Sequence, residues 1–102
     1  MNTLEQHPVP QYIYPFFCEY LTAERGLSSN TVAAYRDAMK LLLGFASERY
    51  ATPPEELTAE QLDEKTILAF LDYLETERNC SVKTRNARLT ALRTFFGFIA
   101  RR

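Results

Sequence analysis

The stretch from Lys83 to Arg88 contains the side chains of the chain that are best suited to binding chemistry. It combines three cations with a threonine and an asparagine, namely Lys83, Thr84, Arg85, Asn86 and Arg88. Arginine and lysine bind phosphate oxygens, arginine also reads guanine, asparagine reads adenine, and threonine contacts the nucleic-acid backbone. A helix that started here would add a partial positive charge at the same place. These residue types indicate a surface for contacts with nucleic acid.

The basic residues are distributed unevenly along the chain. From position 78 onward there are seven basic side chains and no acidic one: Arg78, Lys83, Arg85, Arg88, Arg93, Arg101 and Arg102. All 13 acidic residues lie in the first 77 positions, together with five basic ones. The formal net charge of −1 and the pI of about 5.8 average over this asymmetry. A concentrated positive surface attracts polyanions, and phosphodiester backbones are the commonest of these.

A second polar patch lies at the start of a long helical stretch. It comprises Ser29, Asn30, Thr31, Arg36 and Lys40. Taken alone, the serine and asparagine are helix caps, and the arginine pairs with Asp37 or with a neighbouring helix. The basic end of the chain also has a simpler explanation, a solvated face along which arginines extend beside a core. Lys83 and Arg102 fit that explanation best.

Length and composition indicate one globular domain. A chain of 102 residues with 46% hydrophobic residues can bury roughly two-thirds of its unfolded surface. No apolar run approaches the roughly 20 residues that span a bilayer, and the first ten residues lack a secretory pattern, so we expect a cytoplasmic protein. His7 is the one histidine, and Cys18 and Cys80 are far apart, so neither zinc nor another cofactor is expected. We expect reduced thiols, with Cys18 at a helix core position and Cys80 in a loop, although a disulfide stays open.

Helical periodicity dominates the chain, and no segment alternates like a strand. We expect four helices at about 14–25, from 28–30 to 50, at 64–77 and at 82–100, with a short capped turn at 58–61 and a flexible tail at 1–13. Pro15 and Gly26 suit the two ends of the first helix, and Ser81 suits the start of the last. Four helices with short connections predict a compact all-α bundle.

Apolar stripes on these helices predict the core. They comprise Val32, Tyr35, Met39, Leu42 and Ala46 on the second helix, Ile67, Phe70, Leu71 and Leu74 on the third, and Leu89, Leu92, Phe95, Phe96 and Ile99 on the fourth. Arg85 falls in the middle of the fourth helix's apolar arc, and Arg88 falls near its edge. Burial of Arg85 without a partner would cost several kcal/mol. We therefore expect the first two turns of this helix to overhang the core and to face solvent or a ligand.

Two stretches resemble the signature helices of a known family. Residues 26–37, GLSSNTVAAYRD, and residues 81–96, SVKTRNARLTALRTFF, are similar to those of the N-terminal core-binding domain of tyrosine recombinases, the phage-integrase family. That domain is a SAM-like four-helix bundle, and residues 68–74 fit its third helix. The residues at 85–89 most resemble those of recombinases of transposons and other mobile elements. The resemblance covers residues from about 16 to 102 and implies the same fold.

In that family the domain forms one half of a C-shaped clamp around duplex DNA. The resemblance implies DNA contacts from Ser29, Asn30, Thr31 and Arg36 on the second helix, extended by Lys40 on the same patch, and from Lys83, Thr84, Arg85, Asn86 and Arg88 on the fourth. Tyr35, Leu89, Leu92 and Phe96 match core positions of the family. Arg85 stands where the family often has an apolar residue, so the resemblance defines its role least.

Catalysis in the tyrosine recombinases belongs to a following C-terminal domain, where arginines, a lysine and a histidine support a tyrosine nucleophile. This chain has no His-x-x-Arg, and none of its six tyrosines has a matching context. We therefore expect a module that binds double-stranded DNA without cleaving it and that acts with other recombinase protomers, without a membrane or a small-molecule ligand. The rival hypothesis is a helical protein–protein adaptor with an exposed Phe98.

Overall fold

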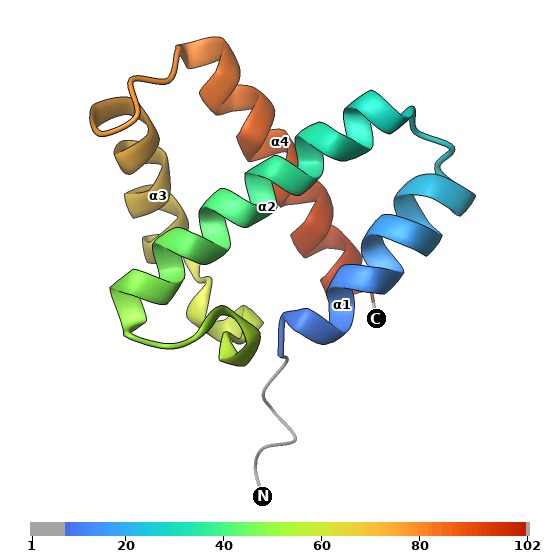
Figure 1. The fold of residues 1–102 in the computed structure, drawn as a ribbon, viewed down its shortest axis with the longest axis horizontal. Helices are drawn as coiled ribbons and strands as arrows, with labels where there is room; N and C mark the ends of the chain where they lie inside the picture. Colours follow the sequence, from blue (N-terminus) through green and yellow to red (C-terminus); the bar gives the residue numbers. More distant parts are fainter. Residues whose placement is uncertain (1–7, 102) are drawn as a thin grey trace, which may run out of the picture.

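The computed structural model describes residues 8–101, and within this range all the regular elements are helical (Figure 1). In chain order they are α1 (Pro10–Tyr14), η2 (Pro15–Glu24), α2 (Ser29–Tyr50), η3 (Pro54–Glu56), η4 (Ala59–Gln61), α3 (Glu64–Thr76) and α4 (Val82–Ala100). The elements α1 and η2 form one continuous helix, because the residues at their junction keep helical backbone angles. The four-helix all-α bundle that the sequence predicts is confirmed.

The first helix differs most from the prediction. It begins at Pro10 rather than near Tyr14, and the buried Val9 donates its N–H to the carbonyl of Leu57 at 2.9 Å. Residues 8–13 are therefore part of the fold rather than of the expected tail, whereas residues 1–7, including His7, lie outside the described residues. From Pro15 onward the helix has the wider π geometry, since a proline inside a helix removes a hydrogen bond and its ring clashes with the carbonyl four residues earlier.

Ser81 caps the last helix as predicted, Ser28 is the cap used among the three candidates at 28–30, and Asp63, the cap of α3, was not predicted. Ser28, Asp63 and Ser81 cap α2, α3 and α4, and the side chain of each accepts a hydrogen bond from a backbone N–H three residues on. Gly26 has a φ of 61°, which suits the left-handed turn that ends the first helix. The short connection contains the capped turn expected at 58–61, now η4, and a second turn, η3, that the sequence analysis did not predict.

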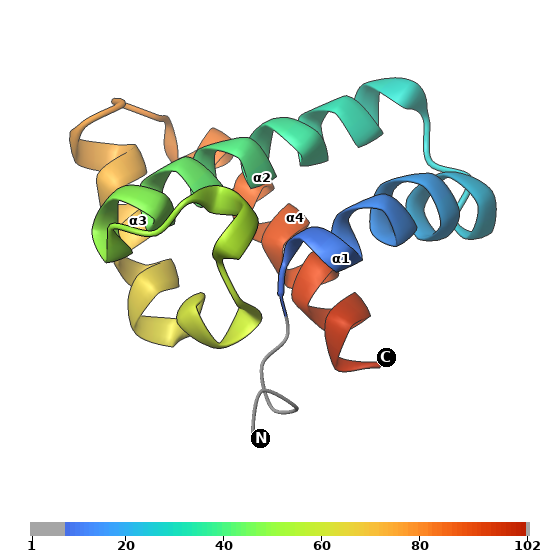
Figure 2. The same cartoon turned by 60° about the horizontal axis from the view of Figure 1, so that its bottom comes forward.

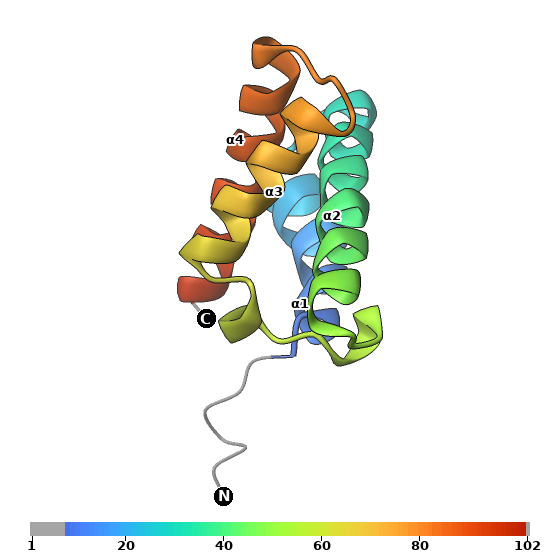
Figure 3. The ribbon, with the colours of Figure 1, turned by 90° about the vertical axis from the view of Figure 1, so that its left-hand side faces the viewer.

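The long helix α2 crosses α4, and α3 and the first helix lie on opposite sides of this crossing (Figure 1). The turned view shows that α2 runs across the whole molecule (Figure 2). From the side, α2 and α4 form two layers, and α3 packs against both (Figure 3). The N-terminal halves of α2 and α4 diverge from the crossing toward the same end of the molecule.

The core lies at the crossing and between α4 and the first helix. Its largest fully buried side chains include Phe16, Phe70 and Phe95. Two expectations about single residues are wrong. Cys18 is exposed rather than in the core, and Phe98 is 2% exposed rather than on the surface. Both cysteines are free thiols, and Cys80 lies in the α3–α4 loop as predicted.

Candidate nucleic-acid interface

An open groove of about 790 Å³ lies between the diverging halves of α2 and α4. It is lined by Asn30, Thr31, Ala34, Tyr35 and Asp37 of α2 and by Lys83, Thr84, Ala87, Arg88 and Thr90 of α4. Residues more than 45 positions apart in the sequence thus meet on one surface, and the two helix starts border it. We call this surface the α2–α4 groove.

The register of α4 explains why polar residues line the groove. Along one face of this helix Thr84, Arg88, Ala91, Phe95 and Phe98 follow one another at spacings of four and three. The last three are buried, whereas the first two line the groove. The groove therefore continues the buried contact between α2 and α4 to the place where the two helices have separated.

The same register holds on α2. Here Thr31 and Tyr35 line the groove, and Ala38 and Leu42, the next residues on this face, are fully buried. Tyr35 was expected in the core, and it lies half-buried in the lining of the groove. The tyrosine therefore belongs both to the packing and to the candidate interface.

Half of the ten predicted contact residues meet in the α2–α4 groove. They are Asn30, Thr31, Lys83, Thr84 and Arg88. Lys83 is exposed, and it forms no ion pair with any residue between 8 and 101. Arg88 is half-buried and donates from Nη1 to the sulfur of Cys80 at 3.0 Å. The other N–H groups of its guanidinium are suited to an anion, because arginine carries five donors in a fixed fork.

Two of the three groove threonines, Thr31 and Thr84, have equivalent surroundings. The capping serine of each helix donates its hydroxyl to a threonine Oγ1, Ser28 to Thr31 and Ser81 to Thr84, both at 3.1 Å. The same serine oxygens accept the threonine N–H groups, which caps both helices. Since each threonine oxygen already accepts a hydrogen bond, its own O–H remains a donor for a ligand in the groove.

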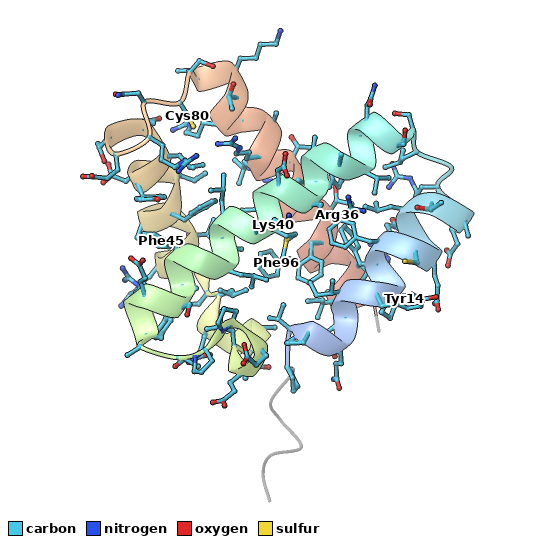
Figure 4. All side chains as sticks on the ribbon, in the orientation of Figure 1. Tyr14, Arg36, Lys40, Phe45, Cys80 and Phe96 are labelled. Atoms are coloured by element: carbon cyan, nitrogen blue, oxygen red, sulfur yellow. The ribbon has the colours of Figure 1, made fainter. Side chains whose placement is uncertain are left out.

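Three of the predicted contacts lie elsewhere on α2. Ser29 is exposed outside the groove lining. The guanidinium of Arg36 lies over the ring of Phe17 in η2, 5.9 Å from its centroid, and forms no ion pair with Asp37. Lys40, labelled on α2 in Figure 4, lines a separate small pocket that also includes Tyr73 of α3. Helical spacing accounts for this, because Arg36 and Lys40 project from other sides of α2 than Thr31 and Ala34 do.

Arg85 and Asn86 also lie outside the groove lining. Arg85 forms an ion pair with Glu75 of α3, and its Nη2 donates to Oδ1 of Asn86 at 3.2 Å. Arg85 was expected in the middle of the apolar face of the fourth helix and Arg88 near its edge, and the structure shows the opposite. Arg88 follows the buried face of α4, whereas Arg85 is directed toward α3 and has a carboxylate partner that the sequence analysis did not identify. The first two turns of α4 do overhang the core, as predicted.

Asp37 is the groove residue with the least expected chemistry. Its side chain is a carboxylate, yet it lines the same groove as the cations Lys83 and Arg88. Its distance of three positions from Ala34 and seven from Asn30 was a signal that it shares their face. Thr90, two positions beyond Arg88, was also missed.

Other kinds of site lack support in the described part of the chain. Residues 8–101 contain no group of three or more histidine, cysteine, aspartate or glutamate side chains that could hold a metal ion. Over the same range, no helix has the length and apolar character needed to cross a membrane.

The comparisons with known proteins agree on one family. The family described as "Phage integrase, N-terminal SAM-like domain" matches residues 16–102. A protein of Sinorhizobium fredii named as an integrase/recombinase, y4rD, is 47% identical over 85 residues, which cover 83% of this chain and 30% of that protein. Tyrosine recombinase XerC of Herpetosiphon aurantiacus is 35% identical over 83 residues, which cover 81% of this chain and 25% of XerC. No solved structure gives a significant match.

The match is limited to one part of these relatives. The chain spans less than a third of the length of the curated relatives that it matches, including a second S. fredii protein named as an integrase/recombinase, y4rC, at 44% identity and 26% of its length. The matched residues include both helices of the α2–α4 groove.

Proposed function

This chain belongs to the family of phage integrase N-terminal SAM-like domains, and we propose that it binds duplex DNA through the α2–α4 groove. The observation that carries the proposal is the convergence of Lys83, Arg88 and two threonine hydroxyls on one open groove between two helix starts. Such donors suit phosphate oxygens, and the positive ends of two helix dipoles add to the attraction.

Seven of the ten groove residues have a proposed role in binding. Lys83 and Arg88 neutralise backbone phosphates, and Thr31 and Thr84 donate hydrogen bonds to them. Asn30 is the side chain that can read a base edge, because its amide carries both a donor and an acceptor. The small side chains of Ala34 and Ala87 allow close approach of the nucleic acid to both helices.

Four of the five predicted contacts outside the groove have a different proposed contribution to binding. Ser29 and Asn86 are exposed at the helix starts and remain proposed contacts at the edges of the duplex. Arg36 and Lys40 are exposed on other sides of α2, so we assign them to the general attraction of DNA rather than to the groove.

We further propose that the chain serves a site-specific tyrosine recombinase in which another domain performs the cleavage. Three observations support this: the relatives are several times longer, the match is to an N-terminal domain, and the tyrosines of this chain lack a matching catalytic context. A mobile element as the source and partner protomers on the same DNA belong to this proposal.

The test is a titration of a short fluorescent duplex at several salt concentrations. If about three to five phosphates are neutralised, log K falls against log salt with a slope of roughly −3 to −4.5. Lys83→Ala should make the slope shallower by about one. Lys65→Ala is the matched control, because this exposed lysine lies on α3 away from the groove. An affinity that does not change with salt contradicts the proposal.

The adaptor hypothesis loses its main support, because Phe98 is buried. It still predicts self-association that persists at high salt. Gel filtration with and without the duplex at two salt concentrations separates the two functions, since a DNA-binding module elutes earlier only with duplex and only at the lower salt.

A further inference from the structure

The corner between α3 and α4 is held by backbone hydrogen bonds. The N–H of Glu77 donates to the carbonyl of Tyr73 at 2.9 Å, and the N–H of Cys80 donates to the carbonyl of Leu74 at 2.9 Å. Asn79 has a φ of 53°, which turns the chain between the two helices. The position of Cys80 relative to α3 is therefore fixed before α4 begins.

Two side-chain contacts join this corner to the overhanging turns of α4. Glu75, in the last turn of α3, pairs with Arg85, and Cys80 accepts a hydrogen bond from Arg88. The side chains of Glu75 and Arg85 are 40% and 30% exposed, so the ion pair is partly shielded from water. These contacts act on the turns of α4 at residues 82–88, in which no side chain is buried in the core.

The orientation of the ion pair opposes both helix dipoles. A cation in the first turn of a helix and an anion in the last turn are each unfavourable within their own helix. Arg85 and Glu75 occupy such positions on α4 and α3. The two charges therefore do not stabilise their own helices, and any stabilisation by the ion pair must come from joining α3 to α4. Residues that break a local rule are often those that serve function.

We propose that Arg85 is a positioning residue that, through Glu75, fixes the angle of the first turns of α4 relative to α2 without contacting DNA. The inference rests on the proposed function, since the angle matters because it sets the spacing of Lys83 and Arg88 from Thr31 across the groove. A preformed groove binds more tightly because less ordering remains to be done on binding. Cys80 supports the same turns through Arg88.

The test is a double-mutant cycle with the charges exchanged. Arg85→Glu faces Glu75 with a like charge and should weaken duplex binding about three- to tenfold. Adding Glu75→Arg restores the pair, and it places both charges favourably on their helices. The doubly exchanged protein should bind within about twofold of the original and with an unchanged salt slope, because no phosphate contact is lost.

A matched pair without contact provides the control. Lys83→Glu on α4 and Glu77→Arg at the C-terminal cap of α3 change the same charges, but no ion pair joins these residues within the described chain. Their effects on affinity should multiply, so the doubly changed protein should show no coupling beyond the two single changes. If the Arg85→Glu, Glu75→Arg protein stays as weak as Arg85→Glu alone, or its salt slope is shallower by about one, Arg85 contacts DNA and the proposal is overturned.

A measurement on the free protein separates this inference from DNA binding. The amides of residues 85–89 should exchange faster in Arg85→Glu and return to the original rate in the exchanged pair, because the link restrains the first turns of α4. Failure of the unaltered protein to bind any duplex would reject the proposed function. Unchanged amide exchange in Arg85→Glu would reject the positioning role whether or not DNA binds.

Discussion

Thr31 and Thr84 occupy the same place on the two helices that border the α2–α4 groove. Each lies three residues after a capping serine, and each has its oxygen engaged by that serine. The cap itself uses the threonine backbone N–H, so the hydroxyl is not needed to start the helix. At this scale the sequence pattern Ser-x-x-Thr therefore combines a structural task, carried by the serine, with a ligand-binding task, carried by the threonine.

Replacement of the two threonines by valine separates these tasks. Thr31→Val and Thr84→Val keep the shape and the backbone cap but remove the donor, so each should weaken duplex binding by about 0.5–1.5 kcal/mol. The salt slope should stay the same, because no charge is lost. Duplex titration checks this, with Thr76→Val on α3 as the control. A loss of helix content in either variant would show that the hydroxyl serves the cap instead.

Asp37 places a carboxylate in a groove that we propose to accept an anion. Asp37→Asn should therefore raise the affinity for duplex at low salt and have less effect at high salt, where screening shortens the reach of the charge. A gain of about three- to tenfold corresponds to roughly 1 kcal/mol, as expected for two charges in a partly hydrated site. Asp72→Asn, on the exposed side of α3, is the control with the same charge change. Weaker binding in Asp37→Asn would instead indicate that the carboxylate accepts from a base.

At the scale of the elements, α3 has a supporting role. Its start is fixed by Asp63 and by the buried Thr66, whose Oγ1 lies 2.9 Å from the carbonyl of Gln61 and 2.5 Å from the hydroxyl of Tyr50. Its end carries Glu75, which reaches α4. The helix thus connects the short turns, the end of α2 and the start of α4, although it contributes no residue to the groove lining.

The cap of α3 makes a prediction about pH. The backbone N–H of Thr66, then its side chain, hold the pKa of Asp63 below its ordinary value of 3.8. A carboxyl whose pKa is lower in the folded state contributes stability above the unfolded pKa, and this stability is lost as pH falls through the folded value. Asp63→Asn should therefore be less stable than the original protein at pH 7, and the difference should shrink below about pH 3.8. Thermal unfolding from pH 7 to pH 2.5 measures it; a difference independent of pH would contradict the cap as the cause.

At the scale of the whole molecule, helix ends and the periodicity of the core could be read from the sequence, whereas side-chain partners could not. Ser81 was predicted as the start of α4, and Ser28, the cap of α2, lies within the predicted range 28–30. The apolar stripe from Val32 to Ala46 is confirmed, with Tyr35 as its half-buried member. The start at Pro10 was missed because a single buried residue, Val9, holds it through a contact with Leu57 nearly 50 positions away.

In the candidate site, too, helix positions could be predicted from the sequence and side-chain partners could not. The two helices and half of the groove residues could be named, because a residue's side of a helix follows from its spacing. The sequence could not show that Glu75 neutralises Arg85, or that Arg36 lies over Phe17, since both depend on the angles between helices. The predicted apolar face of α4 contained Phe96, although the buried residue is Phe98. A prediction that used Phe98 instead would have placed Arg88 on the buried face.

The core and the groove use opposite ends of the same face of α4, and this leads to a prediction for the molecule as a unit. Phe16 of the first helix is fully buried, and its ring centroid lies 4.9 Å from that of Phe95 and 5.4 Å from that of Phe98. Phe16→Ala should lower the free energy of unfolding by about 3–5 kcal/mol, a large part of the roughly 5–15 kcal/mol typical of a domain.

Urea unfolding measures this loss, and Phe96→Ala, which truncates a half-buried ring, should cost less. The fraction of Phe16→Ala that remains folded should bind duplex within about twofold of the original affinity, because distant sites act independently. A larger loss of affinity in the folded protein would mean that the first helix sets the groove through α4. In that case the first helix, and not only the α3–α4 corner, would have to be counted among the elements that position the cations.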